Sequence, residues 1–130
     1  DDRPEFADPA RFPAARDVVH APYEGIMARL PVDPSSYLVI VTRGHSHDKE
    51  VLGQALETDT RYVGMIGSSR KIGIIFDRLR EEGVPPEGRE RVRAAIGIDI
   101  GAEAPEEIAV SIVAELIKVR AGGGKRGGSA

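Results

Sequence analysis

The segment 44–48, with the sequence GHSHD, gathers side chains that can move protons or ligate a metal. They are His45, His47 and Asp48, and they follow closely on the apolar run 38–41. A run rich in β-branched residues and bounded by turn signals predicts a strand buried on both faces, as in a parallel sheet. In open α/β sheets, ligands bind beyond the carboxyl ends of the strands. This segment is therefore the leading candidate for a binding site.

The two histidines of this segment could hold a metal, because His-x-His on an extended segment points both rings to one side. A closed metal site needs further ligands, however, and the one other histidine in the chain is His20. The structural alternative is that Ser46 or Asp48 caps a following helix and the histidines are loop residues. We favour a ligand other than a metal, bound by Gly44 and its neighbours, because histidine titrates near neutrality and can hydrogen-bond a polar ring or a phosphate.

A second candidate site is the segment 67–71, which follows an expected strand over 61–66. Its members are Gly67, Ser68, Ser69, Arg70 and Lys71. A glycine turn at a helix N-terminus offers free N–H groups, and the hydroxyls and positive charges beside them suit a phosphate. The spacing is not that of a Walker A motif. An ordinary serine N-cap beside two solvated basic residues explains the same pattern, and the residues alone leave both interpretations open.

A third candidate is Asp99, which lies between Gly97 and Gly101 ahead of the last expected helix. Glycines on both sides allow the backbone to approach a ligand or another strand closely. The carboxylates of Glu106 and Glu107 follow at the start of that helix, where the helix dipole favours negative charge. We interpret those two as structural and keep Asp99 as a candidate binding residue.

Strands alternate with helices along the chain, which is typical of a parallel sheet built from βαβ units. Helices are expected from residue 46 or 47 onward, over 69–82, and from Pro105 to about residue 121. Less regular elements are expected as a strand over 17–21, a short helix over 23–30 and a strand or extended loop over 96–101. An apolar face of the last helix should be buried; it comprises Ile108, Ile112, Leu116 and Val119, with Ala109 and Val113 beside them.

The opening residues 1–9 look like the loop that follows a strand in a dinucleotide-type fold. In such a fold an acidic residue at the end of the second strand accepts a hydrogen bond from a ribose hydroxyl, and Asp1 or Asp2 occupies that place. The glycine-rich turn that should precede it is absent from the 130 residues. We therefore expect an α/β, Rossmann-like three-layer domain with a mainly parallel sheet that lacks its first βαβ unit.

Composition excludes several classes of function. The net charge of −3 provides no general basic field for nucleic acid, and no apolar run is long enough to span a membrane. The absence of cysteine excludes disulfides, thiolate metal sites and a cysteine nucleophile, and it fits a cytoplasmic protein. The length predicts one domain, over residues 1–121, followed by a glycine-rich flexible tail over 122–130.

Three segments, in order and spacing as well as in residues, resemble the Rossmann-type C-terminal domain of the xanthine dehydrogenase accessory proteins (XdhC/CoxI). They are 42–48, 62–71 and 96–112, and the resemblance extends from residue 1 to about residue 121. It implies a maturation factor or chaperone rather than an enzyme. Such a factor binds molybdenum cofactor (molybdopterin), protects it while a cysteine desulfurase supplies its terminal sulfur, and delivers it to a xanthine dehydrogenase-type molybdenum hydroxylase.

The resemblance also assigns the candidate residues by position. His45, His47 and Asp48 match the family's histidine–aspartate loop, residues 67, 68, 70 and 71 its GSxxK turn, and Gly97, Asp99 and Gly101 its glycine–aspartate turn. We expect Lys71 and the amides of 67–69 to hold the cofactor's phosphate, with His45 or Asp48 facing the pterin or the molybdenum. The alternatives are an NAD(P)-dependent oxidoreductase, favoured by Asp1 or Asp2, and a non-catalytic dimerisation domain. A homodimer is expected, and Ile108, Ile112 and Leu116 are the predicted interface of the dimerisation domain.

Overall fold

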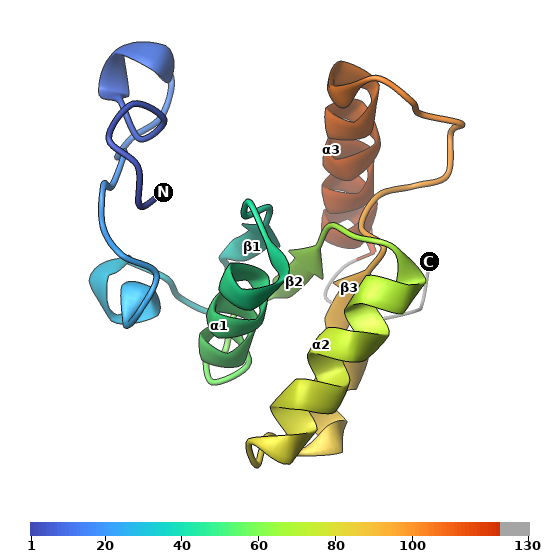
Figure 1. Cartoon of the computed structure of the whole chain (residues 1–130). Helices are drawn as coiled ribbons and strands as arrows, with labels where there is room; N and C mark the ends of the chain where they lie inside the picture. Colours follow the sequence, from blue (N-terminus) through green and yellow to red (C-terminus); the bar gives the residue numbers. More distant parts are fainter. Residues whose placement is uncertain (123–130) are drawn as a thin grey trace.

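A three-stranded parallel sheet organises the chain, whose structure is a computed structural model (Figure 1). Its strands are β1 (Tyr37–Ile40), β2 (Tyr62–Met65) and β3 (Val92–Ala94), in the order β1-β2-β3. The helices are α1 (His45–Ala55), α2 (Ser69–Glu81) and α3 (Pro105–Ala121), with short 3₁₀ helices at η1 (Pro9–Arg11), η2 (Ile26–Arg29) and η3 (Pro86–Arg91). The structure describes residues 1–122, apart from the side chain of His45; all but the first residue of the predicted tail lies outside this range. The predicted α/β class with a parallel sheet is confirmed.

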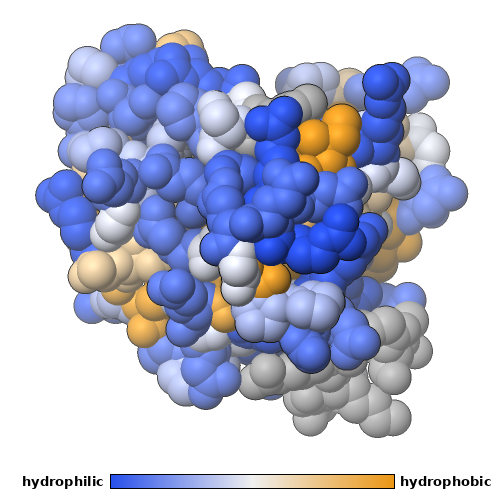
Figure 2. Space-filling model, turned by 60° about the horizontal axis from the view of Figure 1, so that its bottom comes forward, coloured by the Kyte–Doolittle hydropathy of each residue, from blue (hydrophilic) through white to orange (hydrophobic). Residues whose placement is uncertain are grey.

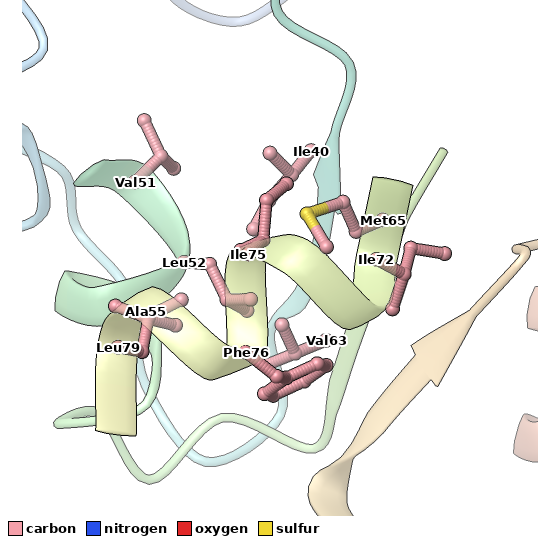
Figure 3. Close-up of a cluster of buried hydrophobic side chains, with 10 residues drawn as sticks. All are labelled: Ile40, Val51, Leu52, Ala55, Val63, Met65, Ile72, Ile75, Phe76 and Leu79. Carbon is pink, nitrogen blue, oxygen red and sulfur yellow. The ribbon is translucent and has the colours of Figure 1, made fainter. Parts of the chain in front are cut away.

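One face of the sheet carries the hydrophobic core. Isoleucine, valine and methionine side chains of β1 and β2 meet the apolar stripes of α1 and α2 there (Figure 3). The buried members are Ile40, Val51, Leu52, Ala55, Val63, Met65, Ile72, Ile75, Phe76 and Leu79. Each large apolar side chain buried in this way contributes roughly 1.5–3 kcal/mol, so this layer fixes how the two βα units stand relative to each other.

The opposite face of the sheet meets α3, because alternate side chains of a strand point to opposite sides. Tyr62 of β2 reaches across to Glu115, and its hydroxyl donates a hydrogen bond to the Glu115 carboxylate. Arg61 donates to the Val119 carbonyl at 3.2 Å. The tyrosine ring lies over Gly64, where an added Cβ would stand 2.7 Å from the ring carbon Cε1. Glycine at this position therefore makes room for the tyrosine, and α3 forms the third layer of the predicted Rossmann-like arrangement.

The inner face of α3 differs from the apolar face that the spacing predicts. Its buried residues are Ser111, Glu115 and Val119, so the side turned to the sheet is largely polar. Ala109 and Val113, predicted to flank a buried face, are exposed. The predicted Ile108, Ile112 and Leu116 are half-buried. The reason is that α3 approaches the tyrosine of β2, whose hydroxyl needs a polar partner when buried.

Two other predicted elements differ. No strand forms over 17–21, where the chain is irregular and Ala21 donates one backbone hydrogen bond to Asp1 O at 3.1 Å. No strand forms over 96–101 either, because the third strand lies earlier, at Val92–Ala94. That strand has the sequence VRA and lies at the edge of the sheet, so it shows no apolar run.

The surface drawn in Figure 2 is mainly hydrophilic, with apolar side chains in small separate patches. Among residues 1–122, none of the helices combines the length and apolarity needed to cross a membrane.

Candidate functional site

The carboxyl ends of β1 and β2 lie at one edge of the sheet, because the two strands run parallel with Ile40 opposite Met65. The loop after β1 covers residues 41–44 and leads into α1, and the loop after β2 covers 66–68 and leads into α2. Two of the three predicted sites therefore meet at this edge, as the order of strands and helices requires.

Asp48 is the residue that joins these two loops. Its side chain is fully buried, at 0% exposure, in the first turn of α1. The Oδ1 atom accepts hydrogen bonds from the Thr42 backbone N at 3.1 Å and from Thr42 Oγ1 at 2.5 Å. The Oδ2 atom lies 2.5 Å from Lys71 Nζ in the first turn of α2. Burial of a carboxylate is costly unless charge and hydrogen bonds compensate it, and here both are present.

Lys71 reaches this carboxylate because of the turn that precedes α2. Gly67 has φ of +145°, and a Cβ there would stand 2.9 Å from Lys71 Cδ. Glycine thus lets the lysine fold back over the turn, where its side chain is 17% exposed. Ser68 caps the helix, since its Oγ accepts a hydrogen bond from Lys71 N at 3.2 Å. The serine N-cap proposed as one interpretation of this motif is therefore present.

The remaining polar groups of the second segment face outward. Ser68, Ser69 and Arg70 are exposed at the start of α2. An α-helix leaves the N–H groups of its first turn without intrahelical acceptors, and the positive end of the helix dipole lies there. Exposed hydroxyls, backbone donors and the Arg70 charge thus surround the partly covered Lys71 ammonium. This arrangement can accept an anion, so the cap and the anion site are compatible.

The histidines are placed differently from the aspartate of the same motif. His47 packs its ring against Tyr23, with ring centroids 4.9 Å apart and an angle of 46° between the planes. The imidazole of His47 therefore lies on the side of α1 that faces the segment leading into η2. The side chain of His45 lies outside the described residues. Within the described part of the chain, no group of His, Cys, Asp and Glu side chains is arranged to hold a metal ion.

Asp2 lies beside the loop after β1. Its Oδ2 atom pairs with Arg43 Nη2 at 2.8 Å, and Arg3 Nε stands 4.0 Å from Oδ1. The Oδ1 atom is buried and, among residues 1–122, has no hydrogen-bond partner. Sequence reasoning selected Asp2 but missed Arg43, which connects it to the same loop as Thr42.

The Asp99 turn lies apart from these residues in its contacts. Gly97 has φ of +105° and approaches α3, where a Cβ would stand 2.6 Å from Ser111 Oγ. Asp99 Oδ1 accepts a hydrogen bond from Gly101 N at 3.2 Å, so this exposed carboxylate stabilises its own turn. Asp99 also lines a cavity of about 250 Å³ with Arg93 and residues of α3. The glycines thus permit close approach to a helix, and no described contact connects Asp99 with the site edge of β1 and β2.

The comparisons with known proteins match this geometry to one family. A model described as the XdhC Rossmann domain matches residues 1–116, which is most of the chain. The chain belongs to the XdhC Rossmann domain family. The predicted resemblance to the xanthine dehydrogenase accessory proteins is thereby confirmed.

Three relatives and a solved structure place this XdhC domain within longer proteins. It is 35% identical to the uncharacterized protein YqeB of Escherichia coli K12, over 89% of the chain and 21% of the relative. It is 32% identical to a Bacillus subtilis 168 protein described as a probable component of xanthine dehydrogenase, over 91% of the chain and 34% of the relative. It is 28% identical to the molybdenum cofactor insertion chaperone PaoD of Escherichia coli K12, over 72% and 29%. A crystal structure described as a xanthine dehydrogenase from Bacillus halodurans matches with a TM-score of 0.77 and 30% identity, over 93% of this chain and 34% of that one.

Proposed function

We propose that this XdhC domain belongs to a maturation factor that binds molybdenum cofactor and supports its sulfuration and its insertion into a xanthine dehydrogenase-type hydroxylase. The family match supports this proposal, as does the similarity to a chaperone named for molybdenum cofactor insertion. The chain spans between about a fifth and a third of the length of these relatives, so the activity of the whole protein is part of the proposal. The redox-active metal and its terminal sulfur belong to the cofactor, and this chain contributes binding and shielding.

The observation that carries the proposal is the Asp48–Lys71 pair under the open N-terminus of α2. An ammonium has three donors, and Asp48 engages one side of the Lys71 ammonium. Its other donors, the Arg70 guanidinium and the amides of 67–69 can hold the phosphate of a pterin cofactor. Asp48 then acts as a positioning residue that fixes where the lysine stands. The donor set therefore fits the phosphate end of the cofactor.

Binding of isolated molybdopterin cofactor, measured by quenching of pterin fluorescence, tests this assignment. We expect Arg70→Ala to weaken binding about tenfold, the effect of losing one charge-assisted contact worth about 1.4 kcal/mol. Lys71→Gln should weaken it further. Arg78→Ala, an exposed arginine near the other end of α2, is the matched control and should leave affinity unchanged. Unchanged affinity in both Arg70→Ala and Lys71→Gln, with the helix content intact, would overturn the phosphate assignment.

The partners belong to the same proposal. A cysteine desulfurase must supply the sulfur, because the chain has no cysteine to carry it. A cytoplasmic homodimer that hands the cofactor to an apo-hydroxylase completes the scheme. Mixing the cofactor-loaded protein with apo-hydroxylase and following the return of hydroxylase activity tests delivery. Activity that returns equally fast with free cofactor would contradict it.

A second candidate is an NAD(P)-binding oxidoreductase, favoured by the Asp2 carboxylate. Its Oδ1 atom is buried and has no hydrogen-bond partner among the described residues, so it could accept from a ribose hydroxyl. Titration with NADH and NADPH, in the wild type and in Asp2→Asn, tests this function. Binding that is lost in Asp2→Asn would support the second candidate, and absence of binding in the wild type would dismiss it.

A further inference from the structure

The outward face of α3 carries an apolar stripe. Val110, Val113 and Ile117 are 60%, 52% and 48% exposed. At about 100° per residue these positions lie on the side of the helix opposite Ser111, Glu115 and Val119, which face the sheet. β-Branched residues at an exposed helix position gain nothing from propensity, so their presence asks for a packing partner.

The stripe has the spacing of a helix–helix contact. From Glu106 through the three apolar residues to Arg120, the intervals alternate between four and three residues. That alternation keeps a line of side chains facing a second helix, as in a coiled coil. We call these five residues the α3 seam. A helix that only had to cover the sheet would not need this repeat on its far side.

The charges at the ends of the α3 seam select one occupant and one orientation. The seam begins with Glu106 and ends with Arg120, and both are exposed. An antiparallel second copy, related by a two-fold axis beside Val113, sets Glu106 of each copy against Arg120 of the other. The same axis sets Val110 of one copy against Ile117 of the other. A parallel copy would instead oppose like charges at both ends, which is destabilising. The seam is thus complementary to itself in the antiparallel sense, as a two-fold interface requires.

We propose that two copies of this chain pair through the α3 seam, with their α3 helices antiparallel. The inference gives the proposed homodimer its contact surface, and it does not depend on the cofactor. A single pair of helices of 17 residues buries less than the roughly 1,600 Å² of a standard interface. We therefore expect an equilibrium dimer with a dissociation constant in the micromolar range.

Single cysteines test the geometry, since the full chain contains none. Val113→Cys places one thiol of each copy beside the axis, and mild oxidation should give a disulfide-linked dimer. Val110→Cys alone should not link, whereas a mixture of Val110→Cys and Ile117→Cys should. Val41→Cys is the matched control, because Val41 is 57% exposed in the loop after β1. Linking of Val41→Cys as fast as Val113→Cys, or of Val110→Cys with itself, would overturn the proposal.

Sedimentation of the full chain without cofactor tests the energetics. Val113→Glu should give a monomer with unchanged helix content. Glu106→Arg should weaken the dimer at least tenfold, and the double change Glu106→Arg with Arg120→Glu should restore it. A wild-type monomer at high micromolar concentration, as expected if another segment or a different protein covers the stripe, would overturn the proposal. Molybdopterin binding by the Val113→Glu monomer then reports on the proposed function separately.

Discussion

Asp48 and Lys71 form an ion pair, 2.5 Å between Oδ2 and Nζ, that joins the first turn of α1 to the first turn of α2. The two residues belong to successive βα units, and Thr42 holds the other carboxylate oxygen. The site edge is therefore one connected unit rather than two independent loops.

Removing one partner of this pair should be costly, because the other charge would remain in a poorly solvated place. We expect Asp48→Ala to lower the free energy of unfolding by about 3–5 kcal/mol, measured by urea denaturation. Thr42→Val should cost about 1–3 kcal/mol by removing one donor. Lys49→Ala is the control, since its pair with Glu82 is more exposed and should contribute less than about 1 kcal/mol. A cost for Asp48→Ala no larger than that of Lys49→Ala would contradict the role given to Asp48.

Two glycines in and before α2 should respond in opposite directions to alanine. Gly67→Ala meets Lys71 Cδ and a φ of +145°, so we expect a loss of about 1–3 kcal/mol and a displaced lysine. Gly73→Ala lies inside α2 with nothing within 4 Å of the added Cβ, and it should stabilise by about 0.5–1 kcal/mol. Thermal unfolding of both variants compares them directly. Destabilisation by Gly73→Ala, or neutrality of Gly67→Ala, would show that the turn is built differently.

Tyr62 should make stability fall in alkaline solution. Burial, and secondly the hydrogen bond to Glu115, raise the pKa of its phenol above the ordinary value. The native state then keeps the proton that the unfolded chain releases above about pH 10. Stability is at its full value below that pH and decreases as the pH rises further. Chemical denaturation across this range in the wild type and in Tyr62→Phe measures the effect, and parallel curves for the two proteins would refute it.

Arg91 should stabilise the turn between α1 and β2. Its Nη1 atom donates to Thr58 O at 2.8 Å and its Nη2 atom to Thr60 O at 2.8 Å. Lysine cannot reproduce this fork, so Arg91→Lys should cost about 1–3 kcal/mol. Arg89→Lys, in the same 3₁₀ helix, has no such carbonyl partners among the described contacts and serves as the control. Equal stability of the two variants would argue against a bidentate role.

The central part of the fold could be predicted because its patterns are local. The stripe of α2 recurs at helical spacing, and all four of its predicted members, Ile72, Ile75, Phe76 and Leu79, are buried. The strand at Val92–Ala94 gave no such signal, since an edge strand of three residues with an arginine has no apolar run. The polar inner face of α3 depends on Tyr62, a residue far away in the sequence, and periodicity within the helix cannot reveal it.

The site was predictable in its members more than in its connections. Sequence spacing selected Asp48 and Lys71 separately, as a helix-start carboxylate and as a basic residue of a phosphate turn. Their pairing arises from the parallel register of β1 and β2, which no local pattern encodes. His47 was selected with Asp48 because they are adjacent, yet adjacent helix residues point in different directions, and its ring packs on Tyr23.

The order β1-β2-β3 leaves β1 at the edge of the sheet. Its four residues, Tyr37 to Ile40, are apolar or aromatic and contain neither proline nor charge. Such an edge is a template for another strand, and natural proteins usually protect it. The practical consequence concerns recombinant production of this segment. Its solubility will be limited by edge-to-edge association at β1 rather than by the stability of its core, and a charged substitution at the partly exposed Val39 is the change that should relieve it.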